Sequence, residues 1–170
     1  IGAGLVCVAI SLSFGIARTS RHRAIAWSAN IYVEFFRGTS VLVQMFWIFF
    51  ALPLFGIFIE PLTAGILALG LNTGAYGAEI VRGGILAVPK GQWEGAHALN
   101  FSKAKRMQRI IIPQIYPIIL PPAANLAVEL LKGTALVSLI TLVDLMFVAK
   151  QINMMTWLSA QSFGLALIIY

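Results

Sequence analysis

Charged residues are scarce in this chain, and cysteine is almost absent. Only 11% of its 170 residues are Asp, Glu, Lys or Arg, whereas about 25% is usual in soluble domains. Hydrophobic residues make up 59%, so the composition excludes a disordered chain and an ordinary soluble enzyme and predicts a polytopic membrane protein. The single Cys7 cannot form an internal disulfide, and His22 and His97 lack a neighbouring ligand cluster, so we expect neither a disulfide scaffold nor a metal site.

Negative charge is scarcer than positive charge, with 6 acidic residues against 12 basic ones. Most of the basic residues gather in two stretches, 18–39 and 82–109. Two apolar runs separate these stretches, so both stretches should lie on the same side of a membrane, and the positive-inside bias makes that side the cytoplasm. The same bias accounts for the net charge of +6 without any nucleic-acid partner.

Long apolar runs are abundant, and a helical span needs about 20 such residues. We interpret residues 1–170 as a single all-α domain, a bundle of transmembrane helices clipped at both ends, because spanning strands would alternate in short segments. Charge does not decide whether the short run at 134–149 crosses the membrane. The candidate spans are 1–17, 40–59, 62–81, 111–131, 134–149 and 162–170.

The basic loop at about 82–110 is too long to be a simple connection between spans. We expect one short helix at 89–99 and a second at 103–110, the second capped by Ser102. Asn100 lies between them and tolerates the left-handed conformation found at helix C-termini. The loop therefore predicts a helix–turn–helix element on the cytoplasmic side.

This loop resembles the EAA loop of ABC importer permeases, whose pattern is Glu-Ala-Ala, three residues, Gly, nine residues and Ile-x-Leu-Pro. The spacing agrees at every position, with Gly95 for Ala, Asn100 for Gly and Ile112 for Leu. The resemblance implies a coupling helix that docks on a cytoplasmic ATPase. The coupling residues that it implies are Gly91, Gln92, Glu94, Gly95, Ala96, Leu99, Asn100 and Pro113.

Further segments are similar to the polar amino-acid subfamily of these permeases, so that the resemblance covers nearly the whole chain. They are residues 32–39, 42–44, 75–84 and 131–136, with Pro121 and Asn125. The resemblance implies a multi-pass protein of the bacterial inner membrane with five spans at full length. In that topology 111–131 crosses, 134–149 is an outer gate element or a helix extension, and the last span begins at 162.

The expected partners follow from the same resemblance. It implies two cytoplasmic ATP-binding subunits, a second permease chain (identical or related) and an extracytoplasmic solute-binding protein, all around a subunit embedded in lipid. The chain has no G-x-x-x-x-G-K-[ST] phosphate loop. We therefore expect a transport subunit that is not itself an enzyme, with no cofactor of its own and with ATP bound by a partner.

Polar residues within the apolar runs are functional candidates, because they are costly in a membrane. Glu129 and Lys132 could complement the amine and the carboxylate of a zwitterion, although polar residues also bond helices together. Glu79 and Arg82 lie three residues apart, as do Glu34 and Arg37, and this spacing fits an interfacial ion pair on one helical face. The candidate substrate-path residues are Gln44, Asn72, Tyr76, Asn125, Glu129 and Lys132, and the candidate gate or relay residues are Glu79, Arg82 and Asp144.

Prolines recur every four residues after the loop, at Pro113, Pro117 and Pro121, and Pro122 follows directly. Proline lacks the N–H donor of a helix and clashes with the preceding turn. We expect Pro113 to end or kink the second loop helix. The others predict a bent or broken element that faces the translocation path. For Pro113 and Pro117 an interfacial elbow before the helix proper is the alternative.

Together these features predict the permease subunit of an ABC importer for a polar amino acid or a similar small zwitterion. A compatible solute such as ectoine is the alternative cargo. A passive channel or carrier is the alternative of another class, and it would need no ATPase dock. An integral-membrane enzyme would show clustered His, Asp or Glu at one membrane face, which the sequence lacks.

Overall fold

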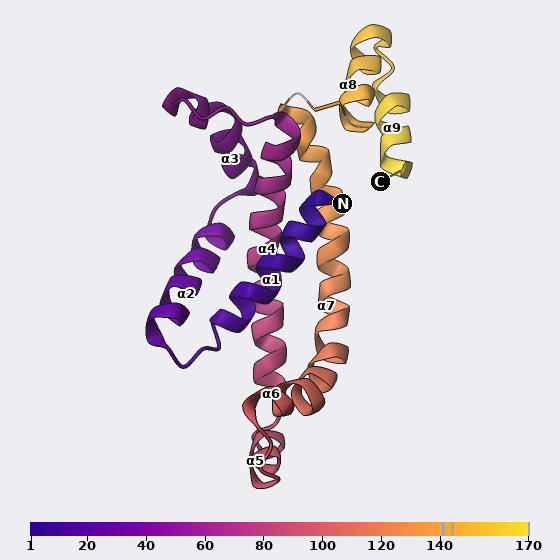
Figure 1. Cartoon of the computed structure of the whole chain (residues 1–170). Coiled ribbons are helices and arrows are strands. Elements are labelled where there is room, and N and C mark those ends of the chain that lie inside the picture. The colour runs from indigo at the N-terminus through magenta and orange to yellow at the C-terminus, as the bar shows by residue number, and fades with distance from the viewer. Residues whose placement is uncertain (141, 144, 170) are drawn as a thin grey trace.

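The computed structural model describes residues 1–140, 142–143 and 145–169, and every regular element in these ranges is a helix. In Figure 1 the central helix α4 packs against α1, α2 and α7, while α8 and α9 lie at one end of the molecule. The elements are α1 (Gly2–Ala17), α2 (Arg23–Gly38), α3 (Val41–Phe46), η1 (Trp47–Ala51), η2 (Leu52–Phe55), α4 (Pro61–Ala87), α5 (Lys90–Ala98), α6 (Lys103–Arg106), η3 (Met107–Ile111), α7 (Ile112–Gly133), η4 (Thr134–Ile140), α8 (Leu145–Thr156) and α9 (Ser159–Ile169).

Close packing of α1 on α4 depends on small residues. A Cβ added at Gly74 would lie 2.6 Å from Ile10 Cγ2, and one added at Gly70 would lie 2.6 Å from Val6 Cγ1. Small residues at such a contact let two helix backbones approach closely, which is how helices associate without a hydrophobic driving force in lipid. On α1 the buried face repeats every four residues and consists of Ala3, Cys7, Ser11 and Gly15.

The basic stretch 18–39 is not an open loop, because most of it is helix α2; its side of the membrane stays a prediction. Helix α2 packs along α4, and the Tyr32 hydroxyl donates to Leu71 O at 2.8 Å. The run at 40–59 is not a full span either, since only Val41–Phe55 is helical and it bends by 100° relative to α2. The two pieces pass the length and hydropathy criteria of a span only together. Hydropathy missed α2 because its polar residues lower the average, although several of them face other helices.

The prolines do not break α7. Helix α7 contains Pro117, Pro121 and Pro122, and it continues without a gap from α6 and the π-helical turn η3. Pro113 therefore does not end the loop helix, as the sequence predicts it could. The turn before Pro113 widens instead, and the Ile112 N–H bonds to Met107 O, five residues earlier. Such a π-bulge leaves room for the proline ring and tolerates the hydrogen bond that is lost with the missing N–H donor.

The far end of α7 bears on only part of the run 134–149, and whether that run crosses the membrane stays a prediction. Residues Thr134–Ile140 extend α7 as a 3₁₀ helix, as a helix extension should, and α8 then begins at Leu145. Helix α9 contains the start of the predicted last span at 162. Asp144, the third gate candidate, lies outside the described residues.

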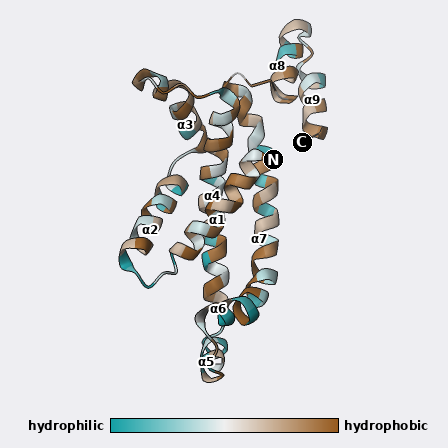
Figure 2. Ribbon diagram, in the orientation of Figure 1, coloured by the Kyte–Doolittle hydropathy of each residue, from teal (hydrophilic) through white to brown (hydrophobic). Residues whose placement is uncertain are grey.

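The number of spans remains a prediction. Among the described residues only the continuous helix Ala104–Ile140 is long and apolar enough to cross a membrane, and the bent α2–α3 pair would make a second span. Helices α1 and α9 are apolar but shorter. Figure 2 shows that polar residues gather around the α1–α2 connection and around α5 and α6, at the same end of the molecule. This arrangement agrees with both basic regions lying on one side.

Candidate functional site

Helix α5 projects from the end of the molecule where α4 meets the base of α7 (Figure 1). One side of it is anchored: Ala96 is 2% exposed, and Trp93 packs against a cluster that includes Val88 and Ile111. The other side faces outward. Because α5 has 9 residues, it depends on this anchoring for stability, since isolated helices of that length are marginal in water.

The end of α5 is a Schellman motif, and Asn100 supplies its left-handed residue. Asn100 has a φ of 55°. Its N–H donates to His97 O at 2.9 Å, and the N–H of Phe101 donates to Ala96 O at 3.2 Å. These two bonds satisfy carbonyl groups that the helix end would otherwise leave free. The prediction of a C-terminal turn at Asn100, in the position where the family pattern has glycine, is confirmed.

Helix α5 is also tied to the start of α7. The Gln114 side chain donates to Gln92 Oε1 at 3.2 Å and to Ile110 O at 2.9 Å. The Arg106 guanidinium lies over the Trp93 ring, 5.5 Å from its centroid. A force applied to α5 can therefore reach α7 directly through these contacts. Helix α5 is therefore fixed to the start of α7 and is not a loose loop.

The outward face of α5 collects most of the predicted coupling residues. A methyl group at Gly91 or Gly95 would meet no atom within 4 Å, so the backbone is open to a partner there. Pro113 is exposed but lies at the start of α7, and Ala96 is buried against the protein. The exposed coupling residues are Gly91, Gln92, Glu94, Gly95, Leu99 and Asn100.

Glu79 lies at the centre of an arginine cluster, which we define as Glu79 with Arg18, Arg37 and Arg82. Glu79 bonds Arg18 closely, lies 2.9 Å from Arg82 Nη1 and lies 3.5 Å from Arg37 Nη1. The pairing of Glu79 with Arg82 is thus as predicted. The predicted pair of Glu34 and Arg37 is wrong, because Glu34 approaches Arg18 at 3.8 Å and Arg37 turns to Glu79.

Arg18 is the member of this cluster that sequence reasoning missed. Its side chain is 7% exposed, and its Nε donates to Asn30 Oδ1 at 2.6 Å. Arg18 follows the end of α1, where a positive charge is expected at the headgroups. Its contact with Glu79 spans 61 positions, and nothing in a single sequence indicates a contact over that separation. The cluster joins α1, α2 and α4.

Most of the predicted substrate-path residues converge on the face between α4 and α7. One hollow of about 350 Å³ is lined in part by Asn72, Tyr76, Glu129 and Lys132. A neighbouring hollow of about 320 Å³ shares Tyr76 and Glu129 and adds Asn125. Arg37 and Glu79 also line the second hollow, so positive and negative groups face one space. Gln44 lines neither hollow and lies buried near Asn72.

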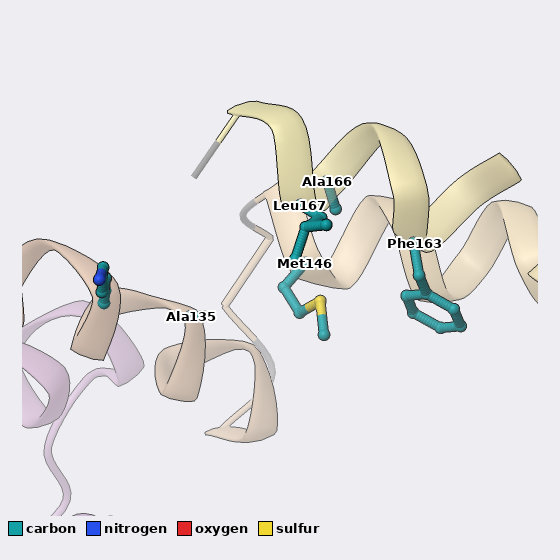
Figure 3. A pocket seen from close by; sticks show the side chains of 6 residues that line it. Ala135, Met146, Phe163, Ala166 and Leu167 are labelled. Atoms are coloured by element: carbon teal, nitrogen blue, oxygen red, sulfur yellow. The ribbon is translucent and has the colours of Figure 1, made fainter. Parts of the chain in front are cut away.

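A larger cavity lies elsewhere, and it offers fewer polar groups. It has a volume of about 650 Å³ and lies between the end of α7 and the α8–α9 pair. Figure 3 shows Ala135 on one side, and Met146, Phe163 and Leu167 on the other. Apart from Lys132, its lining is apolar. The polar hollows between α4 and α7 are therefore the better candidates for binding a small zwitterion.

The chain is similar in sequence to proteins of one known family. The family model "Binding-protein-dependent transport system inner membrane component" matches residues 8–170. The chain is 47% identical to a "Probable amino-acid ABC transporter permease protein" of Sinorhizobium fredii, covering 98% of this chain and 71% of that protein. It is 38% identical to the L-cystine transport system permease protein of Bacillus subtilis, covering 85% of this chain and 62% of that protein.

A solved structure is similar as well. The crystal structure of an amino acid ABC transporter with histidines aligns with a TM-score of 0.90 at 38% identity. The alignment covers 99% of this chain and 79% of the other. The helical arrangement described above, including the placement of α5, is therefore similar to that of a chain in an amino acid ABC transporter.

Proposed function

The chain belongs to the family of binding-protein-dependent transport system inner membrane components, with amino-acid ABC transporter permeases among its relatives, and on this basis we propose that it forms the translocation path of an importer for a polar amino acid. ATP hydrolysis takes place on a partner subunit. The protein lies in the bacterial inner membrane. It moves a solute and carries out no chemistry of its own.

The observation that carries this proposal is the build of α5. The helix is closed by a Schellman turn at Asn100, tied to α7 through Gln92 and Gln114, and open on its outer face at Glu94. A lipid anchor needs none of these features, whereas a lever between a cytoplasmic ATPase and α7 needs all of them. Rigid-body motion of a docked helix can switch a bundle between two packed states.

The solute passes along the hollows between α4 and α7 in this proposal. Glu129 and Lys132 are exposed there and form no ion pair with each other in the described part of the chain. Their opposite charges suit an amine and a carboxylate, while Asn125 and Tyr76 add neutral hydrogen-bonding groups. The proposed partners are two ATP-binding subunits, a second permease chain and an extracytoplasmic binding protein.

Reconstituted transport tests the proposal. Proteoliposomes that contain the chain, its partner permease, the ATPase and the binding protein should take up a polar amino acid only when ATP is present on the ATPase side. Glu94→Arg should abolish uptake and weaken ATPase association, while Glu60→Arg, an exposed acid outside the loop, should not. Uptake without the ATPase or the binding protein would refute the importer function, and intact coupling in Glu94→Arg would remove the docking role of that residue.

A further inference from the structure

The junction between α2 and α3 is a sharp break inside the bundle. The two helices bend by 100°, and Thr39 and Ser40 between them are extended. A helix that ends leaves its last carbonyl groups without intrahelical donors. Free carbonyls are costly where water is excluded, and irregular backbone at membrane depth persists only where other groups satisfy it.

Two buried amides satisfy this break. The Gln44 Nε2 lies 3.1 Å from Phe36 O, 3.3 Å from Thr39 O and 2.5 Å from Thr39 Oγ1. The Asn72 Nδ2 donates to Phe36 O at 2.8 Å and to Gln44 Oε1 at 3.2 Å. The hydroxyl of Tyr76 adds a weaker contact, 3.4 Å from Arg37 O. The end of α2 is thus held by side chains of α3 and α4.

The hydrogens of these amides are used by the chain itself. Each primary amide has two N–H donors, and both donors of Asn72 are directed at Phe36 O and Gln44 Oε1. Gln44 and Asn72 are each 8% exposed. A solute could not take these donors without freeing carbonyl groups of α2. The amides therefore suit a structural clamp better than direct contact with cargo.

The break has a consequence for Arg37, which lies two residues before it. The Arg37 guanidinium lies 5.4 Å from the centroid of the Tyr76 ring and 3.5 Å from Glu79. Its Nε is buried and has no hydrogen-bond partner among the described residues. Arg37 thus lies beside Tyr76 of α4 at the end of α2, next to the break, and the Tyr76 hydroxyl also contacts its carbonyl group.

We propose that Gln44 and Asn72 form a clamp that locks the α2–α3 break onto α4 and thereby positions Arg37 over Tyr76 at the wall of the hollow. They are positioning residues and do not bind the solute. The end of α2, α3 and α4 then move as one body, and the bend is a fixed elbow rather than a hinge. Only the transport readout below rests on the proposed function, and the clamp itself does not.

Local mobility tests the clamp without any transport assay. With Cys7 replaced by Ala, a spin label at Ser40→Cys reports the motion of the break in the full chain in lipid. We expect an immobilised label in this background and a mobile one in Asn72→Leu and Gln44→Met, which keep side-chain size but lose the donors. Thr39→Val removes one acceptor at an exposed position and should loosen the label, whereas Thr39→Ser keeps the hydroxyl and should not.

Solute preference separates a clamp from a binding site. In the reconstituted importer, Asn72→Leu should lower the uptake of two different amino acids by the same factor, about tenfold for a lost buried hydrogen-bond pair. The double variant with Gln44→Met should be no worse than either single variant, because both break one unit. Asn125→Leu, on the neighbouring hollow and outside the clamp, should leave the spin label immobile.

Two results would overturn the proposal. One is a label that stays immobile in all three loosening variants, Thr39→Val included, since that variant should fold even if the buried ones do not. The other is a changed ratio between the two solutes with an unchanged label, which would make the amides contact residues. If the label is immobile in the parent and mobile in the loosening variants, but the parent importer takes up no amino acid, the clamp would be supported and the proposed function refuted.

Discussion

The left-handed turn at Asn100 gives the sharpest prediction about the coupling helix. Its φ of 55° costs an ordinary L-residue about 1–2 kcal/mol, and a β-branched residue more, because its Cβ crowds the backbone. Asn100→Val should therefore destabilise the closed turn, relative to the open one, by at least that amount. Since about 1.4 kcal/mol is a factor of ten in an equilibrium, the closed turn should open roughly tenfold more often.

Hydrogen exchange measures this opening directly. The amides of Asn100 and Phe101 are the donors of the turn, bonded to His97 O and Ala96 O. Their protection should fall about tenfold in Asn100→Val, while Asn100→Gly should keep it, because glycine enters the left-handed region without strain. Both variants remove the amide side chain, so any difference between them reports backbone conformation alone.

Transport should follow the same order. Uptake and ATPase association should drop in Asn100→Val and stay near the parent level in Asn100→Gly, provided that the turn, and not the side chain, is needed for docking. Equal protection in the two variants would refute the assignment of strain to this residue. Equal loss of docking with unequal protection would show instead that the Asn100 amide contacts the partner.

Two further predictions concern the bundle. Gly74→Ala should destabilise the detergent-purified protein by about 1–3 kcal/mol in unfolding titrations, because the new Cβ meets Ile10 at 2.6 Å. A Cβ at Gly83 on the same helix meets nothing within 4 Å, so Gly83→Ala should be neutral or stabilising by up to about 1 kcal/mol. Equal effects of the two substitutions would contradict the close packing of α1 on α4. Glu79→Gln removes the carboxylate that three guanidinium groups share and should cost about 2 kcal/mol or more of stability in the same titration. This is less than for a fully buried pair, because the Glu79 side chain is one-third exposed. Glu34→Gln, at an exposed position, should cost less than about 1 kcal/mol, and the reverse order would refute the central position of Glu79.

What the sequence predicts well here is local chemistry. The turn at Asn100 follows from one residue's tolerance of positive φ, and the first loop helix, α5, follows from Pro89 before it and the turn after it. The second predicted loop helix is not separate, because α6 and η3 continue into α7. The pairing of Glu79 with Arg82 is equally local, being three positions apart on one helix. Such features depend on neighbours in the chain, so a single sequence contains most of what determines them.

What the sequence does not predict depends on contacts between distant segments. The approach of Arg18 to Glu79 and the capping of Phe36 O by Asn72 join positions that only the fold brings together. Hydropathy placed the basic stretch 18–39 outside the bundle because it averages polar and apolar residues and cannot see which ones face α4. The prolines of α7 were expected to break it, but a π-bulge absorbs the change before Pro113.

The side of the membrane on which α5 lies tests the whole account most directly, and thiol labelling can determine that side. With Cys7 replaced by Ala, His97→Cys on α5 is the only thiol of the chain; residue 97 is exposed and lies outside the predicted coupling residues. A membrane-impermeant maleimide should label it in inside-out vesicles but not in right-side-out vesicles, and the bound ATPase should protect it. Labelling from the outer side, or labelling that the ATPase leaves unchanged, would contradict the coupling role of α5.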